Sequence, residues 1–494
     1  MAQLVCSALA KRPLHPAALL EPTCGLGSLL LAGMAQFASL ERIVGADINP
    51  TYVKWLRAAI EQRAGNAKAQ VFEADFFVTD WERVLAELPQ PILVLGNLPW
   101  VTNSQLSALG SQNLPTKSNF QNRTGIDAIT GKANFDISEW MLIRLIEAMK
   151  QREGTLAMLC KTAVARKALR HGWETGIEWE KLAVHRIDAG QHFNAAVDAA
   201  LLVADFRRGA NDQQAVIYQE LASSREQGVV AYEEGSLIAD LGAYQRWKQL
   251  CGGSLKWRSG IKHDCSKVME LRREGGKYRN GLGEIVELED AFLYPMAKSS
   301  HIANAAGKQP VWVIVTQMTV GEDTSRIKEQ APKTWAYLTR HADRLDRRSS
   351  AIYRNRPRYS MFGVGDYTFA PWKVAVSGLY KRFAFTVVGP LDDKPCVLDD
   401  TSYFLPCNTK EHADYLASLL MSPPAQSFYS AFVFWDAKRP ITADLLQRLD
   451  VRALAREMAS EQTFDAFFGN AAQPSGRAAK KRRRTAATLP LWAD

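Results

Sequence analysis

The chain has 494 residues, of which 47% are hydrophobic and 23% charged, and its formal net charge is +9. This length allows roughly two to four domains with substantial cores. No apolar run approaches a membrane-spanning length and the start lacks a secretory pattern, so we expect a cytoplasmic protein. Seven scattered cysteines include no Cys-x-x-Cys pair, which argues against a zinc site or a disulfide framework.

The first motif is a glycine turn after a predicted strand. Glu21 leads into Gly25-Leu26-Gly27, and an apolar, helix-compatible stretch follows at residues 29–37. Glycines let the backbone approach a ligand closely, and a helix start offers unpaired N–H donors. Position 30 is leucine, so the third glycine of a dinucleotide fingerprint is missing. Acidic residues beside this turn favour a cationic cofactor over a pyrophosphate, which predicts S-adenosylmethionine.

Two further predicted strands end in acidic residues. Residues 43–47 form a short strand that ends at Asp47, about twenty residues after the glycines, the spacing at which a carboxylate meets ribose hydroxyls. Residues 70–72 lead to Asp75 and Phe76, which we expect to hold an adenine amino group and ring. Ligands of open α/β sheets bind at the carboxyl ends of strands, so these positions converge on one crevice.

A fourth strand, residues 91–96, leads into Asn97-Leu98-Pro99-Trp100. The Asn97 carboxamide and the carbonyl of Leu98 or Pro99 can each accept one N–H of an exocyclic amine and restore its nucleophilic geometry. Pro99 stiffens the turn, and Trp100 can stack on a base, which is worth roughly 1–3 kcal/mol. The motif predicts methyl transfer to a flat, weakly nucleophilic amine; a plain structural turn is the alternative.

These motifs, with the segments described below, resemble the S-adenosylmethionine-dependent DNA adenine-N6 methyltransferases of the gamma, TaqI-like arrangement, of restriction-modification type, from about residue 4 to about residue 465. The resemblance implies an α/β fold: a Rossmann-like methyltransferase domain with a C-terminal α+β target-recognition domain. It implies cofactor contacts at Glu21, Thr23, Cys24, Gly25, Gly27, Asp47, Ile48, Asp75, Phe76 and Asn97. The catalytic set that it implies is Asn97, Leu98, Pro99, Trp100 and Phe193, with Leu98 where the family has proline.

Downstream segments fit the same resemblance. Asn134 opens a segment with helical apolar spacing and either caps that helix or lines the pocket. A predicted strand at 154–160 precedes a basic helix, and Phe193 precedes an apolar strand at 197–206. The resemblance places Phe193 on the face of a flipped base opposite Trp100, with core packing as the alternative. Flipping an adenine out of a duplex costs a few kcal/mol.

Basic residues point to double-stranded DNA as the partner. Residues 256–279 carry eight Lys/Arg against three acids, and residues 331–360 carry eight against two, interleaved with aromatics. Such segments can follow phosphates, although a solvated face is the alternative. The polar segment 101–133 is longer than an ordinary loop and either contacts DNA or is a solvated excursion. The predicted DNA-binding residues are Lys117, Arg123, Lys262, Lys298, Arg354, Arg358 and Lys373.

The predicted organisation is a methyltransferase domain at 1–225, a connecting helical segment at 226–250, a DNA target-recognition domain at 251–465 and a basic disordered tail at 466–494. In the tail, residues 471–494 hold six Lys/Arg against one acid, which favours phosphate attraction over a localisation signal. Related enzymes begin with a segment that covers the methionine end of the cofactor. Only part of its helix, from Gln3 to Leu9, is present here, so we expect weak cofactor affinity.

Other readings of the same motifs remain open. Ribosomal-RNA adenine-N6 methyltransferases share the Asn-Leu-Pro-aromatic form, and protein-glutamine methyltransferases use a similar motif. A DNA-binding protein with an inactive methyltransferase fold is a further alternative. We expect a monomer whose cognate restriction endonuclease, where one exists, is a separate protein, because the chain shows no convincing nuclease constellation.

Overall fold

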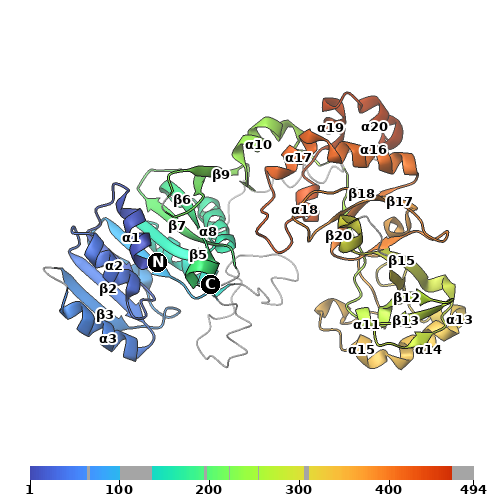
Figure 1. The fold of residues 1–494 in the computed structure, drawn as a ribbon, viewed down its shortest axis with the longest axis horizontal. Helices are drawn as coiled ribbons and strands as arrows, with labels where there is room; N and C mark the ends of the chain where they lie inside the picture. The colour runs from blue at the N-terminus through green and yellow to red at the C-terminus, as the bar shows by residue number, and fades with distance from the viewer. Residues whose placement is uncertain are drawn as a thin grey trace, which may run out of the picture. The chain divides into compact units, whose positions relative to one another are not determined.

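The computed structural model describes residues 1–63, 67–100, 136–193, 197–221, 223–253, 255–304 and 311–469. The chain divides into two compact units, Met1–Leu241 and Gly242–Asp494 (Figure 1). The boundary falls inside the predicted connecting segment 226–250. Over the described ranges, no helix is both long and apolar enough to cross a membrane.

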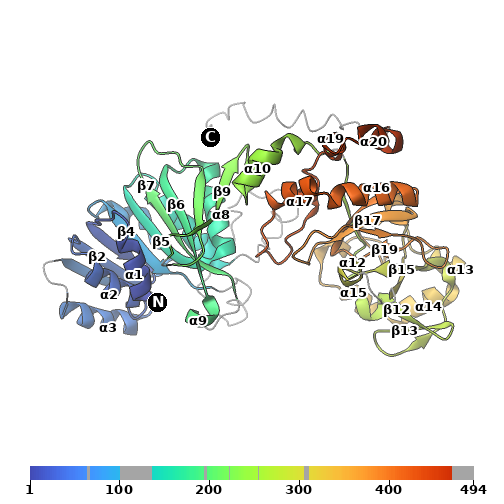
Figure 2. The same cartoon turned by 45° about the horizontal axis from the view of Figure 1, so that its top comes forward.

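A ten-stranded sheet forms the centre of the first unit, in the order β10-β9-β8-β6-β7-β5-β4-β1-β2-β3 (Figure 2). Its strands are β1 (Ala18–Glu21), β2 (Arg42–Asp47), β3 (Lys68–Glu73), β4 (Ile92–Asn97), β5 (Gly154–Lys161), β6 (Trp179–Ile187), β7 (Ala199–Phe206), β8 (Gln214–Tyr218), β9 (Glu226–Glu233) and β10 (Ser236–Ile238). The strands β1 to β5 are parallel, and β7 runs antiparallel between β5 and β6. The strand order reverses between β1 and β4, which makes this pair the switch point where ligands of such sheets bind.

Helices pack on both faces of this sheet. On one face, α1 (Ala2–Ala10), α2 (Ser28–Gln36) and α3 (Pro50–Glu61) share a core cluster with strand residues such as Leu19 and Leu95. The neighbouring residues Leu20 and Val94 point to the other face, since strand side chains alternate. There α7 (Ile137–Met149) contacts both α4 (Trp81–Ala86) and α8 (Thr162–Thr175), and α7 and α8 contact β5. The predicted Rossmann-like α/β domain is confirmed.

The prediction of helix was wrong for residues 226–238, which form β9 and β10. Val229 and Val230 are β-branched, and β9 pairs antiparallel with β8 along their length. The helical part begins only at α10 (Leu241–Trp247). The sheet therefore continues beyond the predicted methyltransferase domain, up to the boundary between the two units.

The second unit combines two smaller sheets with short helices. One sheet has the order β11-β20-β17-β18 and the other β14-β13-β12-β16-β15-β19. The strands are β11 (Arg258–Ser259), β12 (Glu270–Glu274), β13 (Lys277–Asn280), β14 (Ile285–Val286), β15 (Leu293–Ala297), β16 (Val311–Ile314), β17 (Trp372–Ser377), β18 (Thr386–Val388), β19 (Val397–Leu398) and β20 (Ser402–Cys407). Every named pair is antiparallel except β15 with β19, so this unit has the α+β character that we predicted.

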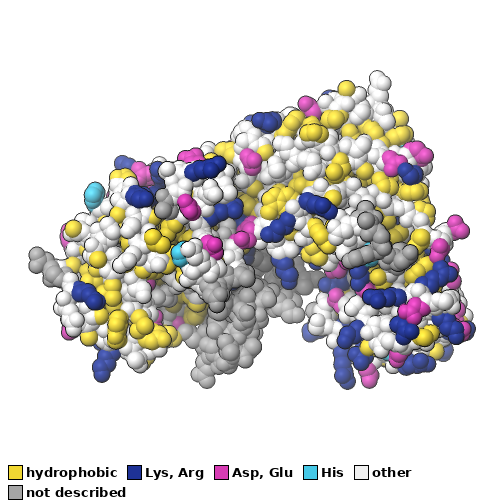
Figure 3. All heavy atoms as spheres, in the orientation of Figure 1, with side chains coloured by type: hydrophobic (Ala, Val, Ile, Leu, Met, Phe, Trp, Pro, Cys, Tyr) yellow, Lys and Arg dark blue, Asp and Glu magenta, His cyan; other side chains and the backbone are white. Residues whose placement is uncertain are grey.

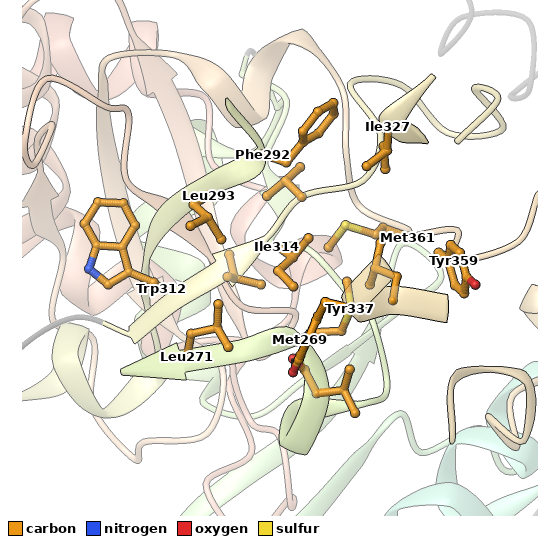
Figure 4. Close-up of a cluster of buried hydrophobic side chains, with 14 of the residues drawn as sticks. Met269, Leu271, Phe292, Leu293, Trp312, Ile314, Ile327, Tyr337, Tyr359 and Met361 are labelled. Atoms are coloured by element: carbon orange, nitrogen blue, oxygen red, sulfur yellow. Dashed lines mark hydrogen bonds between the residues drawn. The ribbon is translucent and has the colours of Figure 1, made fainter. Parts of the chain in front are cut away.

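The second unit has its own cores. Leu271, Leu293 and Trp312 from the six-stranded sheet pack with Tyr337 and Tyr359 in the cluster of Figure 4. The helices are α11 (Ser266–Met269), α12 (Ser299–Ala303), α13 (Ile327–Gln330), α14 (Pro332–Arg340), α15 (Ala342–Asp346), α16 (Lys410–Met421), α17 (Pro423–Ser430), α18 (Ala443–Leu446), α19 (Val451–Glu457) and α20 (Glu461–Phe468). Residues 466–468 of the predicted tail therefore belong to a helix, and residues 470–494 lie outside the described ranges.

Candidate active site

Glu21 ends β1 as a buried acid. It is 3% exposed, and its Oε2 accepts a hydrogen bond from the Leu30 N–H in the first turn of α2, at 2.8 Å. Burial raises the pKa of Glu21 well above its ordinary value, and the nearby charge of Asp47 raises it further. The carboxyl group thus joins the end of β1 to the start of α2 and carries a proton more readily than an exposed glutamate does.

The glycine turn has the backbone geometry that its sequence predicts. Gly25 and Gly27 have φ angles of +52° and +77°, in the left-handed region that favours glycine. A Cβ on Gly27 would lie 2.2 Å from Leu56 Cδ1, so this glycine lets α3 pack closely. A Cβ on Gly25 would meet no atom within 4 Å, so the space above Gly25 is open to a ligand.

Hydrogen bonds tie this turn to the ends of both neighbouring strands. The Gly25 N–H donates to Asp47 Oδ2 at 2.8 Å, and the Cys24 N–H donates to the Ala46 carbonyl at the end of β2. On the other side, Thr23 Oγ1 donates to the Asn97 carbonyl at the end of β4, at 3.5 Å. The predicted residues of β1, β2 and β4 therefore meet at the switch point.

The end of β3 presents a more buried surface than we expected. Asp75 Oδ1 accepts from the Phe77 N–H at 2.9 Å, while Phe76 is 5% exposed and packs against Trp81 with ring centroids 4.9 Å apart. Ile48, directly after Asp47, is 49% exposed and offers an open apolar side chain at the same edge. The adenine contacts of Asp75 and Phe76 stay predictions.

The Asn97-Leu98-Pro99-Trp100 turn follows the end of β4. Asn97 pairs in register with Leu159 of β5, and its side chain is exposed, whereas Leu98 is buried and offers only its backbone to a ligand. Trp100 and Phe193, at the end of α9 (Ala189–Phe193), are both half-buried. Their ring centroids lie 4.9 Å apart at 63°, so residues 93 positions apart in sequence are in edge-to-face contact.

Lys161 and Asp136 lie beside this turn and are absent from our predicted site. Lys161 Nζ donates to the Trp100 carbonyl at 3.0 Å and to Asp136 Oδ2 at 2.5 Å. Asp136 is the N-cap of α7, a role that we considered for Asn134, which lies outside the described residues. The sequence carried a signal, because an Asp followed three residues later by Glu139 before an apolar run is typical of a helix start.

The predicted DNA-binding residues prove to be of several kinds. Lys117 and Arg123 lie outside the described residues. Arg354 is exposed, Arg358 is exposed but pairs with Asp346 at 2.8 Å, Lys262 lies 3.6 Å from Asp264, and Lys298 is ion-paired with Glu270.

The prediction was wrong for Lys373, which is fully buried in β17 and donates to the Ala370 carbonyl at 2.5 Å. The aromatics Trp257, Tyr278 and Tyr359 of the two basic segments are likewise buried, so they build cores and are not a stacking surface.

The two basic segments meet at one hollow of about 600 Å³ in the second unit. The residues that line it are Asp264, Cys265, Ser266, Lys267, Asp343, Arg344 and Arg347. Lys267 comes from the first segment, and Arg344 and Arg347 come from the second. Figure 3 shows many Lys and Arg side chains over the region of β12, β13, α14 and α15, interspersed with Asp and Glu side chains.

A larger hollow of about 950 Å³ lies at the opposite edge of the sheet in the first unit. It is lined by Pro91, which precedes β4, by Gly154, the first residue of β5, and by Phe206 at the end of antiparallel β7. Because the candidate residues occupy the carboxyl ends of β1 to β4, this hollow is not part of the candidate active site.

Comparison with known proteins identifies the family. No protein-family profile matches the chain. Over 459 residues the chain is 43% identical to the type II methyltransferase M.NspV of Nostoc sp.. The aligned region covers 92% of this chain and 95% of that relative. The chain belongs to the type II methyltransferases. Its cofactor is S-adenosyl-L-methionine, as predicted.

Solved structures of similar proteins are more distant. The type IIL restriction-modification enzyme MmeI in complex with DNA covers 97% of this chain and 73% of its own at 11% identity, with a TM-score of 0.48. A putative class I S-adenosylmethionine-dependent methyltransferase from Listeria monocytogenes covers 45% of this chain and 65% of its own, with 11% identity and a TM-score of 0.31.

Proposed function

We propose that this type II methyltransferase transfers a methyl group from S-adenosylmethionine to N6 of a flipped adenine in double-stranded DNA, as the modification enzyme of a restriction-modification system. The observation that carries the proposal is the position of the Asn97-Leu98-Pro99-Trp100 turn. It follows β4 at the switch point, bonded to the glycine turn through Thr23 and in contact with Phe193. An amide, backbone carbonyls and two aromatic rings are the groups that a planar amino substrate requires.

The residues around the glycine turn fit the cofactor. Asp47 is held by the N–H groups of Gly25 and Asn49, each at 2.8 Å, so its carboxylate is oriented before a ribose arrives. The open space above Gly25 admits a ligand close to the backbone, and Ile48 adds apolar contact. Bound S-adenosylmethionine supplies a methyl group activated by a sulfonium, and Asp47 suits that cationic molecule, as Glu21 does when it ionises.

Asn97 acts on the amine by accepting one N–H, while a backbone carbonyl of the turn accepts the other. Both acceptors favour the tetrahedral nitrogen of the transition state over the planar, delocalised nitrogen of the ground state. Asn97 polarises the amine and is not a strong base, so the proton leaves after methyl transfer.

The ring pair must open to hold a base. Two van der Waals contacts of about 3.5 Å each place the planes of rings that sandwich a base about 7 Å apart. The Trp100 and Phe193 centroids are 4.9 Å apart and their planes are far from parallel. Binding of a flipped base therefore requires the two rings to move apart and to turn toward parallel planes. Stacking of the base between them offsets part of the free energy that flipping costs.

Sequence recognition is proposed for the second unit. Its hollow brings together Lys267, Arg344 and Arg347 beside Asp264 and Asp343, and Arg354 is also exposed. Cationic side chains of this kind bind phosphates and set the register of a protein on DNA, while base edges are read by other contacts.

The proposal is tested by identifying the methylated nucleoside. Duplex DNA of mixed sequence is incubated with the protein and isotopically labelled S-adenosylmethionine, digested, and analysed by liquid chromatography and mass spectrometry. We expect N6-methyladenine from the wild type and less than about 1% of that rate from Asn97→Ala, because one of two amine acceptors is lost. Cofactor binding by Asn97→Ala, measured by calorimetry, serves as the control.

Three outcomes would contradict the proposal. N4-methylcytosine as the product would change the target base. Methylation of ribosomal RNA but not of DNA would favour the RNA alternative. A wild type that binds the cofactor and DNA without methylating either would favour an inactive DNA-binding protein.

A further inference from the structure

Lys161 lies at the carboxyl edge of the sheet, next to the candidate catalytic turn. Asn97 on β4 pairs with Leu159 on β5, so Lys161 lies two residues further toward the edge and on the same side of β5 as Leu159. Its side chain is 23% exposed and that of Asp136 is 11% exposed. The ion pair between them is therefore partly withdrawn from water, where charge-assisted hydrogen bonds are stronger.

The contacts of this pair connect the turn to a helix. Lys161 Nζ donates to the Trp100 carbonyl, the last peptide oxygen of the motif, at 3.0 Å. It also donates to Asp136 Oδ2 at 2.5 Å, while Asp136 Oδ1 accepts from the Ser138 N–H at 3.2 Å in the first turn of α7. A continuous series of hydrogen bonds thus runs from Trp100 to a rigid helix of the sheet's outer layer.

We propose that Lys161, held by Asp136, is a positioning residue for the catalytic turn. By fixing the Trp100 carbonyl, Lys161 restricts rotation of the peptide that follows the motif, and so keeps the backbone of the turn, and with it Asn97, in reactive geometry while the Trp100 ring stays free to reorient. The inference rests on the proposed function, because it takes residues 97–100 as the place where the amino group reacts. Displacing reacting groups by about 1 Å can cost on the order of 100-fold in rate.

The test compares Lys161→Ala with a matched control, Lys167→Ala. Lys167 lies in α8 and donates to Glu139 Oε2 of α7 at 2.5 Å. It therefore also joins a lysine to an acid at the start of α7, but among the described residues it makes no hydrogen bond to the turn. The measurement is the single-turnover rate of adenine methylation at saturating cofactor and DNA, which separates chemistry from product release. We expect at least a roughly 10-fold loss for Lys161→Ala and less than a twofold change for Lys167→Ala.

Chemical rescue separates positioning from general loosening of the fold. Methylammonium brings N–H donors into the space that Lys161→Ala vacates, so we expect it to raise the rate of that variant in a concentration-dependent way. Tetramethylammonium carries the same charge without an N–H donor and should not.

Asp136→Asn keeps an oxygen that can cap α7 but loses the charge that holds Lys161. It should also slow transfer, and the double variant Lys161→Ala/Asp136→Asn should be no slower than Lys161→Ala alone.

The outcomes are distinguishable. A wild type that methylates adenine together with a Lys161→Ala rate within twofold of it overturns this inference alone. Equal losses in Lys161→Ala and Lys167→Ala, or equal rescue by the two ammonium ions, also overturn it. A wild type that does not methylate adenine overturns the proposed function, and this inference with it.

Discussion

Glu21 is a carboxylic acid with almost no access to water, and the ionisable groups that interact with it are Asp47 and the Cys6 and Cys24 thiols. Burial raises the pKa values of the Cys6 and Cys24 thiols to about 12, so both stay neutral near pH 7. The pKa of Glu21 lies well above the ordinary value of a glutamate in the folded chain and near that value in the unfolded chain. As pH rises between the two values, the unfolded state loses its proton first, so the folded state loses stability.

Glu21→Gln should remove this effect, because a neutral amide can still accept the Leu30 N–H. We expect the cofactor-free variant to melt at a higher temperature than the wild type at about pH 8, with the difference vanishing below about pH 4. Wild-type affinity for cationic S-adenosylmethionine should rise with pH as Glu21 ionises, and that of Glu21→Gln should not. Melting curves and calorimetry across pH test both statements; parallel affinity profiles for the two proteins would contradict them.

Site residues differ in how far sequence could locate them. Glu21, Asp47 and Asn97 end strands, and parallel strand ends meet at one edge, so local pattern was enough to bring them together. Lys161, the last residue of β5, bonds partners 61 and 25 residues away, and nothing in the local sequence distinguishes it from the basic residues of α8 that follow. Contacts of that kind depend on the tertiary fold.

At the scale of elements, the burial of whole strands determines which charged side chains reach the surface. β17 is almost wholly buried, because it lies between β18 and β20 in the sheet and also contacts the helices α12 and α16. Its alternating side chains are therefore exposed on neither face. Lys373 is consequently enclosed, and burial lowers its pKa to about 8. Counting charges along the sequence could not separate this lysine from exposed ones, and the same limit applies to the buried aromatics of the basic segments.

Lys373→Met tests that assignment. A folded-state pKa below the unfolded value means that the buried ammonium destabilises the fold at low and neutral pH, and that the cost fades as pH rises from about 8 to about 10.4. An apolar side chain of similar length should raise the free energy of unfolding near pH 7 by on the order of 1–3 kcal/mol and leave DNA affinity unchanged. Denaturant unfolding and a binding titration measure the two; a clear loss of DNA affinity would restore the original prediction.

At the scale of the whole molecule, all predicted cofactor residues lie in the first unit and the hollow of about 600 Å³ lies in the second. The two units divide at Leu241–Gly242, inside the segment 226–250 that we predicted as a helical connection and that forms β9 and β10 up to Ile238. Sequence reasoning did not predict β8, β9 and β10, because short segments of this kind do not differ from a linker in local pattern. They are strands because β8 pairs with β6, β9 with β8 and β10 with β9. Sheet extension depends on an available edge, which a local pattern does not reveal.

Gly260→Ala should impair the second unit without affecting cofactor binding by the first. A Cβ at this position would lie 2.1 Å from the Asp399 carbonyl oxygen and 2.2 Å from that of Leu398, so the backbone of the second unit must shift. We expect weakened DNA binding and a lower unfolding temperature for the second unit, with cofactor affinity within twofold of wild type. Hydrogen exchange by mass spectrometry localises the change; equal loss of protection at β1 and β4 would show that the units do not behave separately.

Over the part of the chain that the structure describes, the change from the first unit to the second comes at one place, Leu241–Gly242, shortly after β10. A single recombination event near residue 241 would therefore replace the entire unit proposed to read DNA while leaving the methyl-transfer machinery intact. An architecture with a recognition unit inserted between catalytic strands would need two coordinated crossovers. Evolution of new target sequences by exchange among relatives is correspondingly easier in this arrangement, and a chimera joined at that position is the simplest route to an engineered specificity.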